Sequence, residues 1–314
     1  MSTWIKKTSM PTAKHDFQII GFGPQIYSLT GSNDLTVDVV EIYDIATDQW
    51  TSGPPIPTRR GYIGAALLDR WIYVVGGKTI RTAAEKAATG DDTHFITNDS
   101  MEALDLRTQT WSCLEPLPAP RAALNAAACR GKIYAIGGCH MDRGGDPFDH
   151  VDIFDPASGH WEPGVPLPLQ VWGLAAVTVD DKIYVMGGGG HGGLKNNLHA
   201  FDPDKNQWTA LATMPTARSD LSAIALDRKI YAIGGKSGAP DEAWGCTGCV
   251  EIYDIATDTW STDTPMPQKK AWLAATATQG RIFAMGGANA KKKDSGSHWT
   301  SAEYFDDVHE YALD

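Results

Sequence analysis

Short runs of apolar residues bounded by turn residues recur along the whole chain. Residues 132–136 (Lys-Ile-Tyr-Ala-Ile) and 250–253 (Val-Glu-Ile-Tyr) are two examples, rich in the β-branched and aromatic residues that favour strands. Thirty-two glycines and eighteen prolines interrupt the 314 residues, about one in every six, which leaves little room for long helices. The pattern therefore predicts an all-β protein of many short strands.

A fixed set of spacings repeats six times. Each copy has a tryptophan, a proline seven residues later, and a Gly-Gly pair, or its worn copy Thr30-Gly31, 26 residues after the tryptophan. An aspartate precedes five of these tryptophans by six residues. Ala312 fits the same slot, and counting six residues onward from it passes the end of the chain, re-enters at Met1 and reaches Trp4. The repeat therefore closes on itself. The six tryptophans are Trp4, Trp50, Trp111, Trp161, Trp208 and Trp260.

The combined pattern, Ile-Tyr-x-x-Gly-Gly, Tyr-Asp, Trp and Met-Pro-x-x-Arg, resembles the kelch repeat over the whole chain. The resemblance implies a six-bladed β-propeller of four-stranded antiparallel blades, closed by the N-terminal strand with Trp4, which completes the C-terminal blade. We expect the tryptophans to pack between adjacent blades. We expect one domain over residues 1–314, with blades at about 12–52, 58–113, 121–163, 171–210, 218–262, and 270–314 plus 1–7.

All the variation in repeat length is expected on one face of the propeller. The connections between the second and third strands are longer there, whereas the turns on the other face are short. Long loops on a rigid scaffold are where binding residues usually lie. The same face receives the start of each innermost strand, and the residues at these starts differ from repeat to repeat, which suggests a pocket at the mouth of the central channel.

Candidate catalytic residues at this mouth are Asp220, Asp16, His15 and Tyr62, which could transfer protons to and from one substrate. Three arginines of the repeat could hold a carboxylate through paired N–H donors. The candidate substrate-binding residues are Arg60, Arg121, Arg218, Trp172, Trp272, Ser219, Asn125, Lys78 and Lys236. A purely structural interpretation stays open: the arginines would bond to neighbouring backbone, the aspartates to backbone N–H groups, and the tryptophans would be buried under a loop.

No cofactor is predicted. His140, His191 and His150 are the candidate ligands if a metal ion binds, but their spacing forms no known metal motif. The CxxC at residues 246–249 lacks a second pair and is interpreted as two free thiols. The glycine-rich run at 187–193 lacks the Lys-Ser/Thr and the helix of a phosphate-binding loop.

The charge and the N-terminal sequence narrow the choice of partners and location. The formal charge is -11, which disfavours nucleic acid, and no segment indicates membrane association. Five cysteines and a start without an apolar run favour a cytoplasmic location.

Kelch propellers include both enzymes and interaction modules, so the resemblance leaves the function open. Because interaction modules usually carry a BTB, F-box or similar domain and this chain is all propeller, we predict a pocket for a small polar or aromatic molecule. The expected activity is that of an isomerase or lyase using acid-base groups. The alternative is a non-catalytic module that binds a protein or peptide on the same face, gripping an acidic or terminal motif through the arginines, Lys78 and Lys236.

Overall fold

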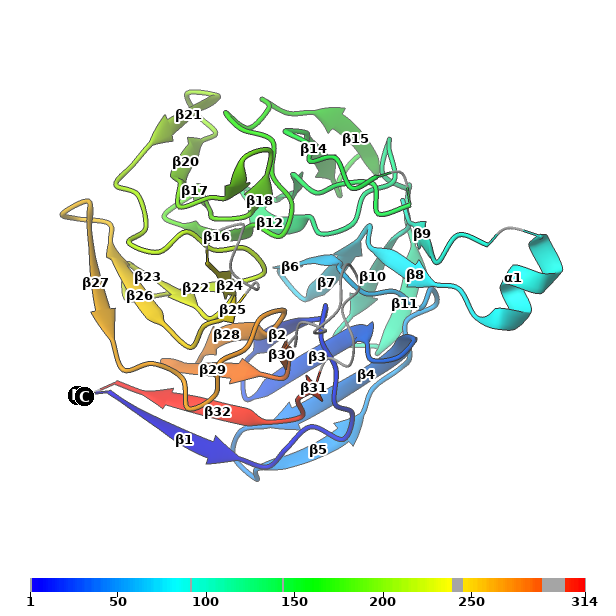
Figure 1. Ribbon diagram of the computed structural model, residues 1–314, viewed down its shortest axis with the longest axis horizontal. Helices are drawn as coiled ribbons and strands as arrows, with labels where there is room; N and C mark the ends of the chain where they lie inside the picture. The colour runs from blue at the N-terminus through cyan, green and yellow to red at the C-terminus, as the bar shows by residue number, and fades with distance from the viewer. Residues whose placement is uncertain (1, 91, 143, 239–244, 290–302, 314) are drawn as a thin grey trace.

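Six four-stranded antiparallel sheets surround a central axis in the computed structural model (Figure 1). The structure describes residues 2–90, 92–142, 144–238, 245–289 and 303–313. The fold is a six-bladed β-propeller, which confirms the predicted fold class. We number the blades 1 to 6 along the chain and their strands from the axis outward.

Blades 1 to 3 are formed by consecutive stretches of chain. Blade 1 contains β2 (Gln18–Phe22), β3 (Gln25–Ser32), β4 (Thr36–Asp44) and β5 (Gln49–Ser52). Blade 2 contains β6 (Gly64–Leu68), β7 (Trp71–Val75), β10 (Met101–Asp105) and β11 (Thr110–Cys113). Blade 3 contains β12 (Asn125–Cys129), β13 (Lys132–Ile136), β14 (Val151–Asp155) and β15 (His160–Pro163).

Blades 4 and 5 continue this order, and blade 6 closes the ring. Blade 4 contains β16 (Ala175–Val179), β17 (Lys182–Met186), β20 (Leu198–Asp202) and β21 (Gln207–Ala210). Blade 5 contains β22 (Ser222–Leu226), β23 (Lys229–Ile233), β26 (Val250–Asp254) and β27 (Thr259–Asp263). Blade 6 contains β28 (Ala274–Thr278), β29 (Arg281–Met285), β32 (Val308–Ala312) and, from the other end of the chain, β1 (Thr3–Lys7).

The N-terminal strand is the outermost strand of blade 6, as predicted. β1 pairs with β32 in antiparallel register, with Trp4 opposite Tyr311 and their rings 4.7 Å apart. Without β1, the last blade would expose an unpaired strand edge. The two ends of the chain therefore lie side by side at the outer rim of the propeller (Figure 1).

Each repeat tryptophan links its own blade to the preceding one. Its indole N–H donates to a backbone carbonyl at the outer end of the neighbouring blade, over 2.7 to 3.1 Å in all six cases. Six hydrophobic clusters fill the spaces between adjacent blades, such as the one that joins Tyr134 and Ile136 of blade 3 to Ile183 and Val185 of blade 4. The sheets are thus held together by shared cores, because one blade cannot bury both of its faces.

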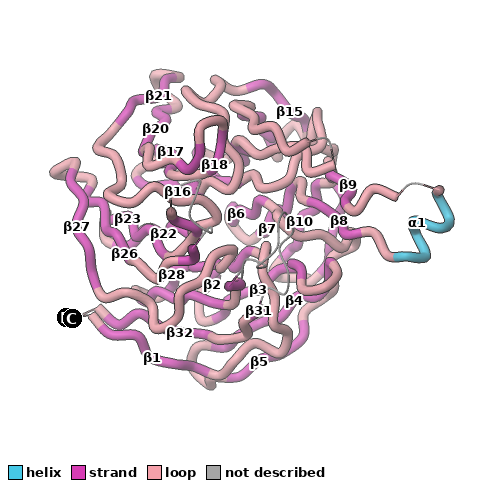
Figure 2. The backbone as a smooth tube through the Cα atoms, viewed as in Figure 1, coloured by secondary structure: helices cyan, strands magenta, loops and turns pink. Residues whose placement is uncertain are grey.

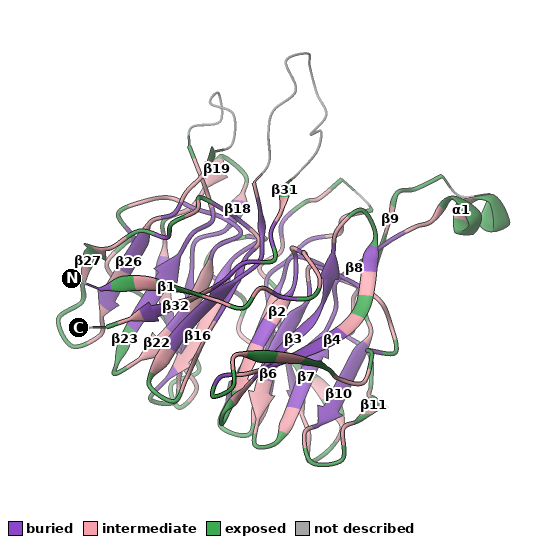
Figure 3. Ribbon diagram, turned by 90° about the horizontal axis from the view of Figure 1, so that it is seen from below, coloured by how far each residue is buried: buried purple, intermediate pink, exposed green. Residues whose placement is uncertain are grey.

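The long connections lie on one face (Figure 3). They carry four two-stranded ribbons: β8 (Lys78–Ile80) with β9 (Phe95–Thr97), β18 (Gly189–Gly190) with β19 (Gly193–Leu194), β24 (Lys236–Ser237) with β25 (Gly245–Cys246), and β30 (Ala288–Asn289) with β31 (Glu303–Tyr304). We call this side the long-loop face and the opposite side the tight-turn face.

Helix α1 (Ala83–Thr89) projects from the ribbon of blade 2, and it is the only helix in the described parts of the chain (Figure 2). Thr82 caps its N-terminus in a capping box with Glu85, and Gly90 ends it in the left-handed conformation. None of its residues is buried. Over the described ranges, no helix has the length and hydrophobicity needed to span a membrane.

Candidate functional site

Six residues at the same repeat position, twelve after each tryptophan, form a closed ring around the axis. The backbone N–H of each ring residue donates to the carbonyl of the ring residue in the preceding blade, over 2.7 to 3.3 Å. All six have a left-handed backbone, with φ between 53° and 61°. The ring residues are Asp16, Tyr62, Ala123, Gly173, Asp220 and Trp272. The ring fixes where six different side chains meet at the mouth of the channel.

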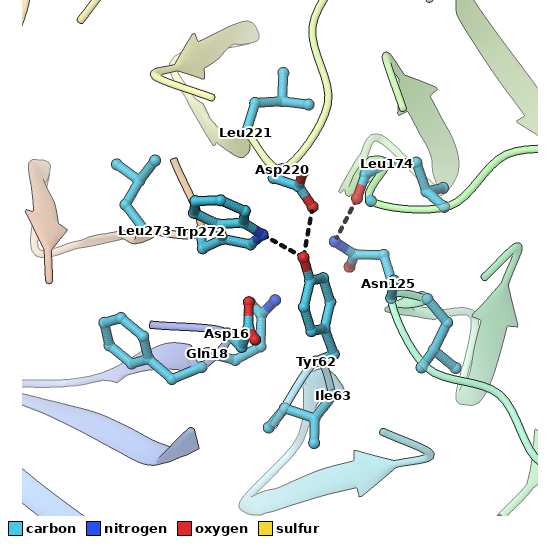
Figure 4. Close-up of a pocket in the computed structure, with 14 residues that line it drawn as sticks. Asp16, Gln18, Tyr62, Ile63, Asn125, Leu174, Asp220, Leu221, Trp272 and Leu273 are labelled. Atoms are coloured by element: carbon cyan, nitrogen blue, oxygen red, sulfur yellow. Dashed lines mark hydrogen bonds between the residues drawn. The ribbon is translucent and has the colours of Figure 1, made fainter. Parts of the chain in front are cut away.

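Two bulky ring side chains close most of the mouth. The Trp272 indole N–H donates to the Tyr62 hydroxyl, which lies 3.4 Å from Oδ1 of Asp220 (Figure 4). Bulky residues rarely adopt a left-handed backbone, so the ring hydrogen bonds hold Tyr62 and Trp272 in a costly conformation. Burial, together with Asp16 and Asp220, raises the pKa of Tyr62 well above its ordinary value. Tyr62 is therefore a neutral hydrogen-bonding group here.

The Asp16 carboxylate is fully enclosed but has His15 and Lys78 as close neighbours. His15 Nδ1 lies 3.1 Å from Oδ1, and Lys78 Nζ lies 3.3 Å from Oδ2. Burial by itself would raise the pKa of Asp16, but the charges of His15 and Lys78 outweigh it and lower this pKa. The Lys78 ammonium also lies over two aromatic rings, 4.3 Å from the Tyr62 centroid and 4.7 Å from that of Phe95.

Asp220 has a matching arrangement on the other side of the ring. Ser219 Oγ donates to Asp220 Oδ2 over 3.0 Å, and Lys236 Nζ lies 3.2 Å from the same oxygen. The Lys236 ammonium is 3.8 Å from the centroid of Trp272. The structure thus brings all four predicted catalytic residues together with both predicted lysines, but each carboxylate already has a lysine beside it.

The space left at the ring is small. The cavity among the ring residues, Asn125 and their neighbours has a volume of about 50 Å³, and Asn125 Nδ2 donates to the Leu174 carbonyl on its wall. A wider section of about 270 Å³, lined mostly by small residues of the innermost strands, lies along the channel beyond it. Pockets for small molecules generally hold about 300–1,000 Å³, whereas about 30 Å³ accommodates one water. The ring cavity therefore has room for water rather than for a metabolite.

The three predicted arginines are not brought together at the mouth, because each is buried in its own blade. Their side chains are 0% exposed, and each pairs with a carboxylate on the third strand of its own blade. Lysines occupy the same slot in blades 1 and 6 and also pair with carboxylates. The pairs are Lys14–Glu41, Arg60–Glu102, Arg121–Asp152, Arg218–Glu251 and Lys270–Asp307. These cations neutralise buried charge inside five of the six blades, and none lines the ring cavity.

Trp172 lies beside the ring and is partly exposed. A Cβ atom on Gly189 would lie 2.6 Å from its indole, so only glycine in β18 lets the ring rest on the backbone. Three further partly exposed aromatic residues of the long loops, which we did not single out from the sequence, are Phe95, Phe148 and Tyr304. Tyr304 stacks on His15 at a centroid distance of 5.0 Å. They have no fixed place in the repeat, so only their position in long loops could have indicated them.

The candidate metal ligands do not converge. The Phe148 ring contacts both His140 and His150, stacking on the latter at 4.9 Å. His191 is exposed in the loop of blade 4, and its carbonyl accepts a hydrogen bond from Lys195. In the described portion of the chain, no three His, Cys, Asp or Glu side chains are grouped so that they could hold a metal ion. All five cysteines are free thiols.

The fold and its crowded mouth define a β-propeller whose variable loops surround one end of the channel. Residues 163–287 match the family model described as the KLHDC2/KLHL20/DRC7 Kelch-repeats domain, and residues 120–168 match the Kelch motif. The chain is therefore a kelch-repeat β-propeller, as its sequence pattern predicts.

Proteins similar to this chain include Kelch-like protein 40 of Xenopus tropicalis, which is 27% identical over 76% of this chain and 37% of that protein. Kelch-like protein 40a of Danio rerio is 39% identical over 78% of this chain and 38% of its own length. Beta-scruin of Limulus polyphemus is 30% identical over 59% of this chain and 20% of its own length. The chain thus spans less than half the length of these relatives.

These relatives overturn the predicted enzymatic function. They are Kelch-like proteins and a scruin, not isomerases or lyases, so the prediction of an isomerase or lyase acting on a small molecule is wrong. The geometry agrees with this correction, because Asp16 and Asp220 are covered and matched with lysines. The findings favour the alternative of a non-catalytic interaction module with protein partners.

Proposed function

We propose that this chain is a protein-interaction module that binds a protein or peptide segment on its long-loop face. The observation that carries the proposal is a collar of six partly exposed aromatic residues on this face, contributed by blades 2, 3, 4 and 6. The members of the aromatic collar are Tyr62, Phe95, Phe148, Trp172, Trp272 and Tyr304. Aromatic residues are enriched in protein interfaces and dominate their binding energy.

Three features support this function over small-molecule chemistry. The ring cavity of about 50 Å³ is too small for a metabolite, while the loops around it vary in length and sequence. The relatives named above are Kelch-like proteins. We further propose that the six blades act as one binding domain, and that the module works in the cytoplasm, where its free thiols would persist.

The test compares two aromatic truncations on opposite faces. Trp172→Ala removes part of the aromatic collar, whereas Phe22→Ala removes an exposed ring, 39% accessible, at the tight-turn end of β2. Wild-type and variant proteins, matched for thermal stability, are used as baits on extracts of the source cells, and the bound proteins are quantified by mass spectrometry. We expect Trp172→Ala to lose proteins that Phe22→Ala retains. If both variants retain every bound protein, or only Phe22→Ala loses them, the long-loop face is not the interface.

A further inference from the structure

Exposed charges are unevenly divided between acidic and basic residues on the long-loop face. The described connections on this face expose nine carboxylate side chains but only one lysine or arginine side chain, that of Lys269. The nine are Asp34, Glu85, Asp92, Asp99, Glu115, Asp142, Asp146, Glu303 and Asp306. At least four of them have partners within the chain. Arg59 pairs with Glu85, and His160 contacts Glu115. Thr97 Oγ1 donates to Asp142, and the Tyr304 hydroxyl donates to Asp34.

The tight-turn face shows that this imbalance is not a property of the whole surface. Its turns expose six carboxylates and five basic side chains. The six acidic residues are Asp69, Asp180, Asp181, Asp204, Asp227 and Asp258, and the five basic residues are Arg70, Arg107, Arg130, Lys205 and Arg228. The net charge of -11 is therefore concentrated toward the face that carries the aromatic collar.

The basic residues of the long-loop face are mostly turned inward. The five lysines and arginines of the repeat slot are buried in ion pairs with third-strand or adjacent carboxylates. Lys78 and Lys236, with side chains 8% and 12% exposed, lie against Asp16 and Asp220 and over aromatic rings. These cations are thus not available to grip an acidic motif. By sequence, residues 91, 143, 239–244 and 290–302, which lie outside the described ranges, add four acidic and four basic side chains, which leaves the balance acidic.

We infer that the partner segment bound by this face is cationic, a stretch of protein rich in lysine and arginine. This inference rests on the proposed function. Exposed carboxylates attract such a segment over about 8 Å at physiological ionic strength, and aromatic faces bind ammonium and guanidinium groups at close range. Lys78 and Lys236 each lie between a carboxylate and an aromatic ring. Lysine and arginine side chains of the partner would make the same kinds of contact with the carboxylates and the aromatic collar.

The test uses three fluorescent peptides of equal length on one framework of serine, glycine and tryptophan. One carries lysine and arginine, the second glutamate and the third glutamine at the same positions. Fluorescence anisotropy measures their binding to the protein at low and physiological salt. We expect the basic peptide to bind at least about tenfold more tightly than the other two, with an affinity that falls as salt rises.

Two variants with the same change in net charge locate this binding. The first neutralises the long-loop face by Asp34→Asn, Asp99→Asn, Asp146→Asn and Glu303→Gln. The second neutralises the tight-turn face by Asp69→Asn, Asp180→Asn, Asp181→Asn and Asp227→Asn, all at left-handed positions that asparagine tolerates. We expect the first to weaken binding of the basic peptide about tenfold and the second to change it less than about twofold.

The inference is overturned if the acidic or neutral peptide binds as well as the basic one, if none binds, or if the two variants weaken binding equally. These outcomes are distinct from failure of the proposed function. If Trp172→Ala loses bound proteins while the protein shows no preference for the basic peptide, the interaction module stands and only its cationic partner is rejected. If Trp172→Ala loses nothing that Phe22→Ala retains, the proposed function itself fails.

Discussion

Replacing Arg218 by methionine would leave a buried carboxylate without its counter-ion. Arg218 is 0% exposed, and its guanidinium lies 2.7 Å from Glu251 Oε2, while the Glu251 side chain is 1% exposed. The same guanidinium donates to the carbonyl of Gly234 over 2.8 Å. Removing one partner of a buried ion pair costs about 3–5 kcal/mol, because the remaining buried charge is left without a counter-ion. We expect Arg218→Met to lower the free energy of unfolding by that amount.

The matched control removes both charges. In the double variant Arg218→Met, Glu251→Gln, the neutral amide can still accept the hydrogen bond that Thr216 Oγ1 now donates to Glu251 Oε1 over 2.6 Å. Most of the lost stability should return, which a double-mutant cycle of urea unfolding would measure. Blade 4 gives a natural precedent, since Val171 fills the cation slot there and His199 replaces the acid.

The interpretation fails if Arg218→Met costs less than about 1 kcal/mol, or if the double variant is no more stable than the single one. Binding to captured partners offers a second readout. Arg218→Met should bind normally under conditions in which it is folded. If it is stable but no longer binds, Arg218 contacts the ligand after all, and the buried pair is not its main role.

Three further predictions concern the ring and the closure of the propeller. Gly173→Ala places a Cβ 2.6 Å from Asp220 Oδ1 in a left-handed backbone. We expect the free energy of unfolding to fall by about 1–3 kcal/mol, as measured by thermal unfolding. Unchanged stability would show that the ring is loosely packed. The pKa of Asp16 is lower in the folded protein, so its ionised form stabilises the fold above pH about 4, and this contribution disappears as the pH falls through the folded pKa. The difference in unfolding free energy between wild type and Asp16→Asn should therefore become smaller in acid. A difference that does not change with pH would contradict this reasoning. Trp4→Ala removes the indole hydrogen bond to the Thr264 carbonyl and the packing that closes blade 6. It should lower the free energy of unfolding by about 3 kcal/mol, as measured in urea. A change near zero would show that β1 contributes nothing to stability.

The architecture was predictable because it rests on spacings that a single sequence displays. The passage from Ala312 through the chain ends to Trp4 predicts that β1 pairs with β32, and the structure has that pairing. A propeller repeats one hydrogen-bonding and packing solution six times, so six imperfect copies reinforce one another. Variation in any one repeat, such as Thr30 at the first glycine position, does not hide the period.

The role of the arginines was also visible in the sequence, as a correlation within the repeat. Where the slot ten residues after the tryptophan holds Arg60, Arg121 or Arg218, an acidic residue lies three positions before the aspartate of the third strand. Where the slot holds Val171, that position is a histidine. Blade 6 departs from this rule, because Lys270 occupies the slot while His309 occupies the acidic position, and Asp307 supplies the carboxylate. In the other five blades the two charges occur together or are both missing, which indicates that they are partners for each other rather than for a ligand.

The arrangement at the mouth could not be read from the sequence. Trp272 and Tyr62 are 210 residues apart, and they meet only because both adopt a left-handed backbone that most bulky residues avoid. The volume of the ring cavity depends on these side-chain positions. The sequence shows which residues approach the axis, but whether they leave a pocket or fill it depends on packing.

The adjacent ends of the chain make the propeller a ring cut at one point on its circumference. The cut lies between β1 and β32, where Thr3 pairs with Ala312, far from the axis (Figure 1). Any polypeptide fused to either end therefore starts from the perimeter and need not cross the collar. A fluorescent protein or an affinity tag can be attached at both ends without blocking the surface whose ligand is sought. The cut could also be moved to another hairpin by circular permutation, which would change the strand that closes the circle but not the circle itself.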